Sequence, residues 1–250
     1  MKVVATYSIK GGVGKTASAV NLAFEAAGAG ARVLVWDLDP QGAASFYFRV
    51  RAEVKGGSER LVAKPGDLGR HVRATDVPGL HLVPADFSLR HLDLHLDATK
   101  RPTERLSALL APLAGSYDCA LVDCPPSISL ASESMFGAAG HLLVPVIPTT
   151  LSARTLEQLT GFLAGRPDPP RLLPHFSMVD RRKTLHREQM ESLAASWPEF
   201  LTTVVPSSSA VERMGVERAP VALFARRTAA AQAYRELWAE VAGRLWPATG

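Results

Sequence analysis

The sequence predicts a three-layer α/β fold, in which a mostly parallel, twisted sheet is flanked by helices on both faces. Apolar runs of strand length alternate with alanine- and leucine-rich segments of helix length from residue 2 onward. A glycine-rich segment joins the first such run to the first helix, and right-handed crossovers between later runs give a parallel sheet. The chain has 250 residues, and we expect residues 1–250 to form one domain.

The expected elements follow from hydrophobic periodicity and from glycine, proline and aspartate at their ends. The expected strands cover residues 3–9, 32–36, 80–85, 117–123, 141–147, 172–179 and 202–206. The expected helices cover residues 17–27, 67–73, 88–96, 103–113, 132–140, 154–164 and 229–246. Thr103 is the expected N-cap of its helix. Residues 50–66 show no clear period, which indicates a surface loop or a short irregular helix.

The segment Lys10-Gly11-Gly12-Val13-Gly14-Lys15-Thr16 follows the first expected strand and opens the first helix, which is the setting of a phosphate-binding loop. Glycines let backbone N–H groups point inward at an anion, and the helix N-terminus adds its positive dipole end. Lys15 is expected to bridge the β- and γ-phosphates, and the Thr16 hydroxyl to bind Mg²⁺. The predicted nucleotide-binding set extends over this segment to Ala17. Ile9 stands where the standard loop has glycine, and the standard loop requires no lysine at position 10.

This form of the loop resembles the deviant Walker A loop of the ParA/MinD family of ATPases, which are SIMIBI-like P-loop NTPases. The resemblance implies that Lys10 reaches across a dimer interface to the nucleotide of the other subunit. Two further motifs follow in the family's order. The segment Asp37-Leu38-Asp39-Pro40-Gln41-Gly42 looks like the first switch of the ParA branch, and Asp123-Cys124-Pro125-Pro126 looks like the second.

Carboxylates therefore stand at the ends of the second and fourth expected strands, where open α/β sheets bind ligands. By the resemblance, Asp39 orients or activates the attacking water, and Asp37 supports the magnesium shell. Asp123 holds a water of that shell or the Thr16 hydroxyl. The expected catalytic residues are Lys10, Lys15 and Asp39, and the expected metal residues are Thr16, Asp37 and Asp123.

The ends of the later strands flank the nucleotide base in relatives, which places Met178, Asp180 and Pro206 near adenine. Basic side chains beyond these ends fit a DNA phosphate-backbone footprint. They are Arg181, Arg182, Lys183, Arg187, Arg213 and Arg218. Many ParA proteins have arginine at the position of Ser207. DNA contact has therefore shifted to later arginines or weakened, and a merely solvated basic face is the alternative.

The bulk composition is compatible with a polyanionic partner but does not demand one, since the net charge is +4 and the pI about 9.3. Cys119 and Cys124 are expected to be buried thiols. No run approaches the roughly 18 apolar residues of a membrane span. A MinD-type basic tail is missing after Trp246, which argues against membrane targeting.

The resemblance implies an ATP- and Mg²⁺-dependent switch ATPase of the ParA type without an N-terminal helix-turn-helix extension. We expect an ATP-dependent sandwich homodimer that binds duplex DNA without sequence preference. A ParB-like or cargo adaptor protein would stimulate hydrolysis, and the cargo would be a plasmid, a chromosome locus or a large cytosolic assembly. The expected location is cytoplasmic and nucleoid-associated. The alternatives are a MinD-like positioning ATPase on a membrane and a metabolic ATP-dependent ligase of the same fold.

Overall fold

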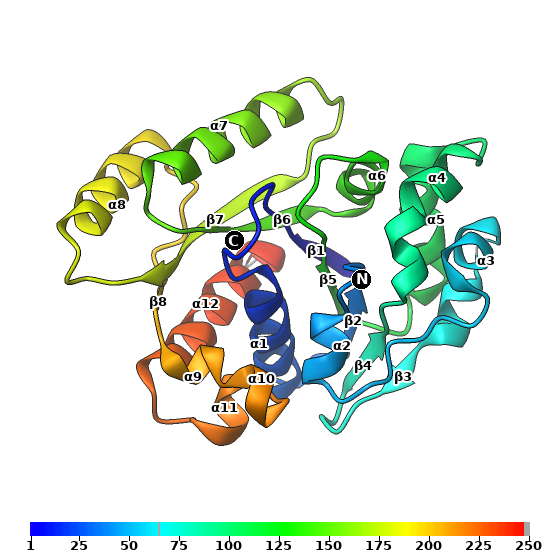
Figure 1. Cartoon of the computed structure of the whole chain (residues 1–250), viewed down its shortest axis with the longest axis horizontal. Helices are drawn as coiled ribbons and strands as arrows, with labels where there is room; N and C mark the ends of the chain where they lie inside the picture. The colour runs from blue at the N-terminus through cyan, green and yellow to red at the C-terminus, as the bar shows by residue number, and fades with distance from the viewer. Residues whose placement is uncertain (65, 248–250) are drawn as a thin grey trace.

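The computed structural model describes residues 1–64 and 66–247, which form an eight-stranded sheet flanked by helices (Figure 1). The sheet order is β3-β4-β2-β5-β1-β6-β7-β8, and all neighbours are parallel except β3 and β4. The strands are β1 (Lys2–Thr6), β2 (Val33–Asp37), β3 (Arg73–Ala74), β4 (Leu80–Val83), β5 (Cys119–Asp123), β6 (His141–Val146), β7 (Arg171–Val179) and β8 (Val204–Pro206). The predicted three-layer α/β fold is confirmed.

The helices vary widely in length. The helices of six residues or more are α1 (Lys15–Gly28), α3 (Gly57–Ala63), α4 (Leu92–Asp97), α5 (Arg105–Leu110), α6 (Leu130–Ala138), α7 (Thr150–Ala164), α8 (Thr184–Ser196) and α12 (Ala229–Leu245). The shorter ones are α2 (Ala43–Tyr47), α9 (Ser209–Glu212), α10 (Met214–Glu217) and α11 (Val221–Phe224). Single 3-10 turns are η1 (Asp67–His71), η2 (Phe87–His91), η3 (Pro102–Glu104) and η4 (Ala111–Leu113).

The two faces of the sheet carry separate hydrophobic cores, because the central strands are buried on both sides. Along β2, Leu34 and Trp36 belong to the core under α4 to α8, whereas Val33 and Val35 belong to the core under α1 and α12. Figure 1 shows α1 (blue) and α12 (red) side by side on their face. The phosphate-loop helix is thus held against both the sheet and the last helix.

Several expected boundaries are wrong for local reasons. The region 103–113 is not one α-helix but η3, α5 and η4 in series, and Thr103 lies inside η3 without capping it. Pro112 lacks the N–H that an uninterrupted helix needs at that point. Helix α7 starts at Thr150 because the Thr149 hydroxyl accepts from Ser152 N, four residues before the expected start. Helix α8 was not predicted from the sequence.

Two further expectations concern the cysteines and membrane-spanning helices. Cys119 and Cys124 are free and buried, as expected. In the part of the chain that the structure describes, no helix combines the length and the apolar character needed to cross a membrane. Residues 248–250 of the tail, on which the prediction of no membrane grip partly rests, lie outside the described residues.

Candidate nucleotide and metal site

The phosphate loop lies between β1 and α1, at the C-terminal edge of the sheet. Within the described residues, none of the backbone N–H groups from Gly11 to Ala17 donates a hydrogen bond. Gly12 and Gly14 have φ values of 72° and 94°, which side chains other than glycine rarely adopt. A curl of unpaired N–H groups at a helix N-terminus is a site for an anion such as a phosphate.

The two lysines of the loop lie in different environments. The Lys15 side chain is buried, and its Nζ donates to Lys10 O at 3.4 Å. Burial lowers the pKa of Lys15, and the nearby charges of Asp123 and Asp39 oppose that shift. Neither lysine forms an ion pair with a described residue, and the Lys10 side chain is exposed. Lys15 is thus a buried cation without a bonded anion, which a bound phosphate would supply.

Asp37 and Asp123 are brought together by the sheet, because β2 pairs with β5 and the two aspartates are register partners. Both are fully buried. Ser45 donates to Asp37 Oδ2 from its N at 2.7 Å and from its hydroxyl at 2.6 Å, while Asp37 Oδ1 has no partner. The Thr6 hydroxyl, whose nearest acceptor is Val122 O at 3.0 Å, lies 3.4 Å from Asp123 Oδ1, while Asp123 Oδ2 has no partner. Each carboxylate therefore keeps one buried, unsatisfied oxygen.

The electrostatics of this pair favour a bound cation. Burial raises the pKa of Asp123, and the charge of Asp37 raises it further, whereas the nearby Thr16 hydroxyl lowers it. Burial also raises the pKa of Asp37, and the bonds from Ser45 oppose that shift. Two buried carboxylates and a hydroxyl are oxygen ligands of the kind Mg²⁺ takes, directly or through water. The residues present therefore fit a magnesium ion beside the phosphate loop.

Asp39 is less buried than Asp37 and Asp123. Its Oδ1 accepts from Gln41 N at 2.9 Å and its carbonyl accepts from Gly42 N at 2.9 Å, so the aspartate closes a tight turn. The residue is only half-buried, and its charge acts on both Lys15 and Asp123. Its second oxygen makes no hydrogen bond with a described residue, and can therefore accept from water.

A buried polar layer supports the loop from the side of β7. A Cβ added to Gly14 would lie 2.9 Å from Ser177 Oγ, so the loop passes directly over that side chain. His175 is fully buried, with Nε2 3.3 Å from Ser18 Oγ at the start of α1. Asn21, one turn further on, accepts from Val221 N at 2.8 Å. The first turns of α1 are thereby fixed to β7 and to α11.

Comparison with known proteins identifies the family of this chain. A family model described as an AAA domain matches residues 1–165. The chain is 30% identical over 255 residues to the chromosome partitioning protein ParA of Caulobacter vibrioides, and the match covers 98% of this chain and 95% of the relative. The chain belongs to the ParA/MinD family of P-loop ATPases.

Solved structures of the same fold hold the ligands that the site fits. Cobyrinic acid a,c-diamide synthase from Mycobacterium smegmatis, with bound ATP analogue and magnesium, superposes with a TM-score of 0.82 at 25% identity. That match covers 100% of this chain and 97% of the other. The ATP complex of a McdA variant from Cyanothece gives 0.81 at 18% identity, covering 98% of this chain and 96% of the other.

Of the three residues predicted to lie near adenine, only two line the same pocket. Asp180 and Pro206 line one surface pocket of about 600 Å³, whose opposite wall is the first turns of α12. Met178 is not on the pocket wall; it is 40% exposed and has a φ of 54° at an irregularity in the β7–β8 pairing. The Asp180 carboxylate is held by Arg182, which forms bonds of 2.9 Å to both oxygens and keeps the pKa of Asp180 at about 2.

The residues predicted to bind DNA fall into two groups. Arg181, Arg182, Lys183 and Arg187 are exposed in the β7–α8 turn and the start of α8, whereas Arg213 and Arg218 are exposed on either side of α10. Figure 1 shows α8 and α10 at separate places on the molecule, so the six do not form one compact patch. Arg213 is also paired with Glu217.

Some residues of the site were missed from the sequence. Ser45 links three segments, since it donates to Asp37 and its hydroxyl accepts from Ala85 N at 2.9 Å. The Thr6 hydroxyl lies beside Asp123, and His175 lies beside Ser18. His175 and Ser177 interrupt a mainly apolar strand, which is a signal in the sequence, but it does not indicate which helix the histidine meets.

Proposed function

We propose that this chain is a ParA-type switch ATPase that hydrolyses ATP with Mg²⁺, forms a sandwich homodimer in the ATP state and then binds duplex DNA without sequence preference. Its role is to partition or position a plasmid, a chromosome locus or a large cytosolic cargo. An adaptor protein stimulates hydrolysis, and the protein acts in the cytoplasm at the nucleoid. The ATPase unit is one domain of residues 1–250.

The observation that carries the proposal is the contrast between the two lysines of the loop. Lys15 points into the buried site, where a phosphate is its natural partner. Lys10 is exposed on the same loop and has no ion-pair partner among the described residues. A second cation on the outer side of a phosphate site can act on the nucleotide of a facing subunit, which an enzyme working as a monomer does not require.

The hydrolysis step then follows from the residues in place. Lys15 and the N–H groups of the loop hold the phosphates, and Thr16, Asp37 and Asp123 would hold Mg²⁺, which neutralises charge on the phosphate oxygens. Asp39 accepts a hydrogen bond from water and aligns it with the γ-phosphorus. The water oxygen bonds to phosphorus as the bond to the β–γ bridging oxygen breaks; ADP leaves with that electron pair, and the water proton passes to an oxygen of the released phosphate. Lys10 of the other subunit stabilises the charge of the transferred group.

A contact between α2 and α10 supports coupling between this site and the basic surface. Arg218 lies over the Phe46 ring at 4.5 Å from its centroid, and its Nε donates to Phe46 O at 3.3 Å. In return, Arg49 Nε donates to Arg218 O at 3.2 Å. Arg49 and Arg218 have φ values of 58° and 47°. This left-handed conformation is uncommon for residues other than glycine, and both residues of the contact adopt it.

The same contact connects back to the metal site. Helix α2 follows the first switch directly, and Ser45 in its first turn is bonded to Asp37. A ligand that moves Asp37 or the switch therefore moves α2, and α2 bears on the segment that carries Arg213 and Arg218. We propose this route for the nucleotide dependence of DNA binding.

DNA retention on random-sequence duplex tests the proposal, measured with ATP, ADP and no nucleotide at low and moderate salt. We expect retention with ATP alone, and a salt slope that falls by about two units in an Arg213→Gln/Arg218→Gln variant. Arg101→Gln is the matched control, because Arg101 is an exposed, ion-paired arginine remote from α10. No retention with any nucleotide would reject DNA as the track, and vesicle binding would then be measured for the MinD-like alternative.

The metabolic-ligase alternative rests on the match to cobyrinic acid a,c-diamide synthase. The two readings differ in what stimulates ATP turnover. A partition ATPase responds to duplex DNA and an adaptor, whereas a ligase responds to a small-molecule carboxylate with glutamine or ammonia. Stimulation by the latter pair and not by DNA would favour the ligase, and Lys10→Ala would then leave turnover intact.

A further inference from the structure

A second concave site lies at the N-terminal ends of β6 and β7, at the edge of the sheet opposite to the phosphate loop. It has a volume of about 340 Å³. Pockets of about 300–1,000 Å³ with mainly apolar walls and a few polar groups are typical of small-molecule sites. Its apolar wall consists of Leu156, Leu172, Leu173, Pro174 and Trp197.

The pocket exists because β8 does not cover the full length of β7. The ladder between them begins at Phe176 and Val204, and only the bond from Leu201 N to Pro174 O precedes it. Arg171 to Leu173 therefore form an uncovered edge of the sheet. Trp197 and Glu199 line the pocket beside this edge, and Arg244 is the lining residue that comes from the end of α12.

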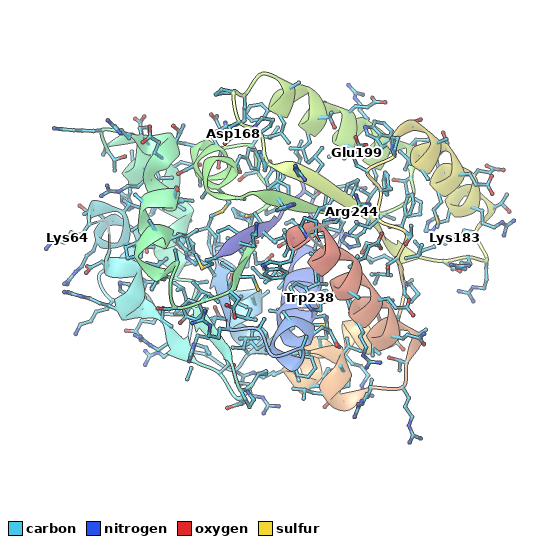
Figure 2. All side chains as sticks on the ribbon, turned by 180° about the vertical axis from the view of Figure 1, so that it is seen from behind. Lys64, Asp168, Lys183, Glu199, Trp238 and Arg244 are labelled. Carbon is cyan, nitrogen blue, oxygen red and sulfur yellow. The ribbon has the colours of Figure 1, made fainter. Side chains whose placement is uncertain are left out.

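The polar groups of the pocket are mostly cationic or neutral. Arg171 and Arg244 are exposed residues that line the pocket, and neither has an ion pair or side-chain hydrogen bond with any described residue. Figure 2 shows Arg244 and Glu199 on the rear side of the molecule, where the end of α12 approaches β7. Glu199 is exposed and is the one carboxylate among the lining residues.

His141 adds an unsatisfied group to the same wall. Its Nε2 is buried and has no hydrogen-bond partner. Burial lowers the pKa of His141, and the charges of Arg171 and Lys2 lower it further, so the imidazole is neutral at pH 7. A buried polar atom without a partner is costly, and a ligand that donates to it or accepts from it removes that cost.

We propose that this pocket binds a small organic monoanion with a flat apolar body. Arg171 and Arg244 hold the anionic group, and planar guanidinium groups suit a carboxylate or sulfonate. The apolar body lies against Trp197, Pro174 and the leucines. Glu199 disfavours a second negative charge at the rim, which is why a monoanion fits better than a dianion. The site is independent of the proposed DNA and nucleotide functions.

Calorimetric titration with 2-naphthoate tests the proposal, in the presence of saturating Mg-ADP so that the nucleotide site is blocked. We expect one saturable site per chain, with 2-naphthoate bound at least about tenfold more tightly than the neutral isostere 2-naphthamide. Arg171→Gln and Arg244→Gln each weaken binding by about tenfold, whereas Arg101→Gln leaves it unchanged. Glu199→Gln binds equally well or more tightly.

Either of two results would overturn the proposal that this pocket binds a monoanion. One is the lack of saturable binding up to millimolar concentrations, and the other is equal affinity for 2-naphthoate and 2-naphthamide in every variant. If an arginine variant does not fold by circular dichroism, NMR on the wild-type chain decides. A shift of the Trp197 indole N–H on addition of 2-naphthoate supports the proposal, and shifts confined to residues outside the pocket reject it.

Discussion

The pH dependence of stability should carry a specific contribution from His175, the buried histidine behind the phosphate loop. Its side chain is fully buried, its Nε2 lies 3.3 Å from Ser18 Oγ, and its Nδ1 has no partner. Burial lowers the pKa of His175 to about 3. The unfolded chain has an ordinary histidine pKa of about 6.5.

The sign and the size of the change in unfolding free energy follow from the difference between the folded and unfolded pKa values of His175. Because the folded pKa lies below the unfolded one, the unfolded state binds the extra proton between pH ~6.5 and ~3, so stability falls as the pH falls through that window. At pH 5, which is roughly 1.5 units below the histidine pKa of the unfolded chain, protonation stabilises the unfolded state by about 1.36 kcal/mol per unit. The expected loss of unfolding free energy from pH 7 to pH 5 is therefore about 2 kcal/mol from this residue alone.

Urea denaturation of the wild-type chain and of His175→Gln at pH 7 and pH 5 measures this contribution. Glutamine keeps a polar group toward Ser18 but does not titrate, so the variant should lose about 2 kcal/mol less than the wild type between the two pH values. His91→Gln is the control, because His91 is exposed and its variant should follow the wild type. Equal losses in the wild type and in His175→Gln would refute the reasoning.

The remaining predictions concern the loop, its helix and the first switch. Gly14→Ala should weaken nucleotide binding at least about tenfold, since the added Cβ meets Ser177 Oγ and the left-handed φ costs about 1–2 kcal/mol. Adding Ser177→Ala should recover only part of the affinity in a fluorescent-nucleotide titration, and full recovery would contradict the backbone argument. Asn21→Ala should lower the unfolding free energy by about 1–3 kcal/mol in urea, because Val221 N–H is left buried without an acceptor. Asp39→Ala should retain ATP binding and dimerisation but stop phosphate release, and normal turnover in that variant would remove Asp39 from its proposed role.

The residues predicted to contact the base and DNA show where prediction from the sequence weakens. Asp180 and Pro206 do share a pocket, since consecutive parallel strands end at the same edge. Met178 takes a positive φ at an irregular point of the β7–β8 ladder and does not line that pocket, although its neighbour Val179 does. The basic residues are separated because their segments follow different strands, and spacing along the chain says nothing of the distance between those segments.

The sequence by itself determined the α/β fold, the phosphate loop and the order of the two aspartate motifs that resemble switches, because these depend on local periodicity and on short motifs. It also placed Asp37 and Asp123 at strand ends. Only the tertiary structure decided that these two carboxylates are neighbours, since that depends on β5 lying between β2 and β1. The same holds for the bond from Ser45 to Asp37 and for His175 against Ser18. Such contacts join residues from separate segments, and the pairing of segments is fixed by packing of the whole chain rather than by any one stretch of it.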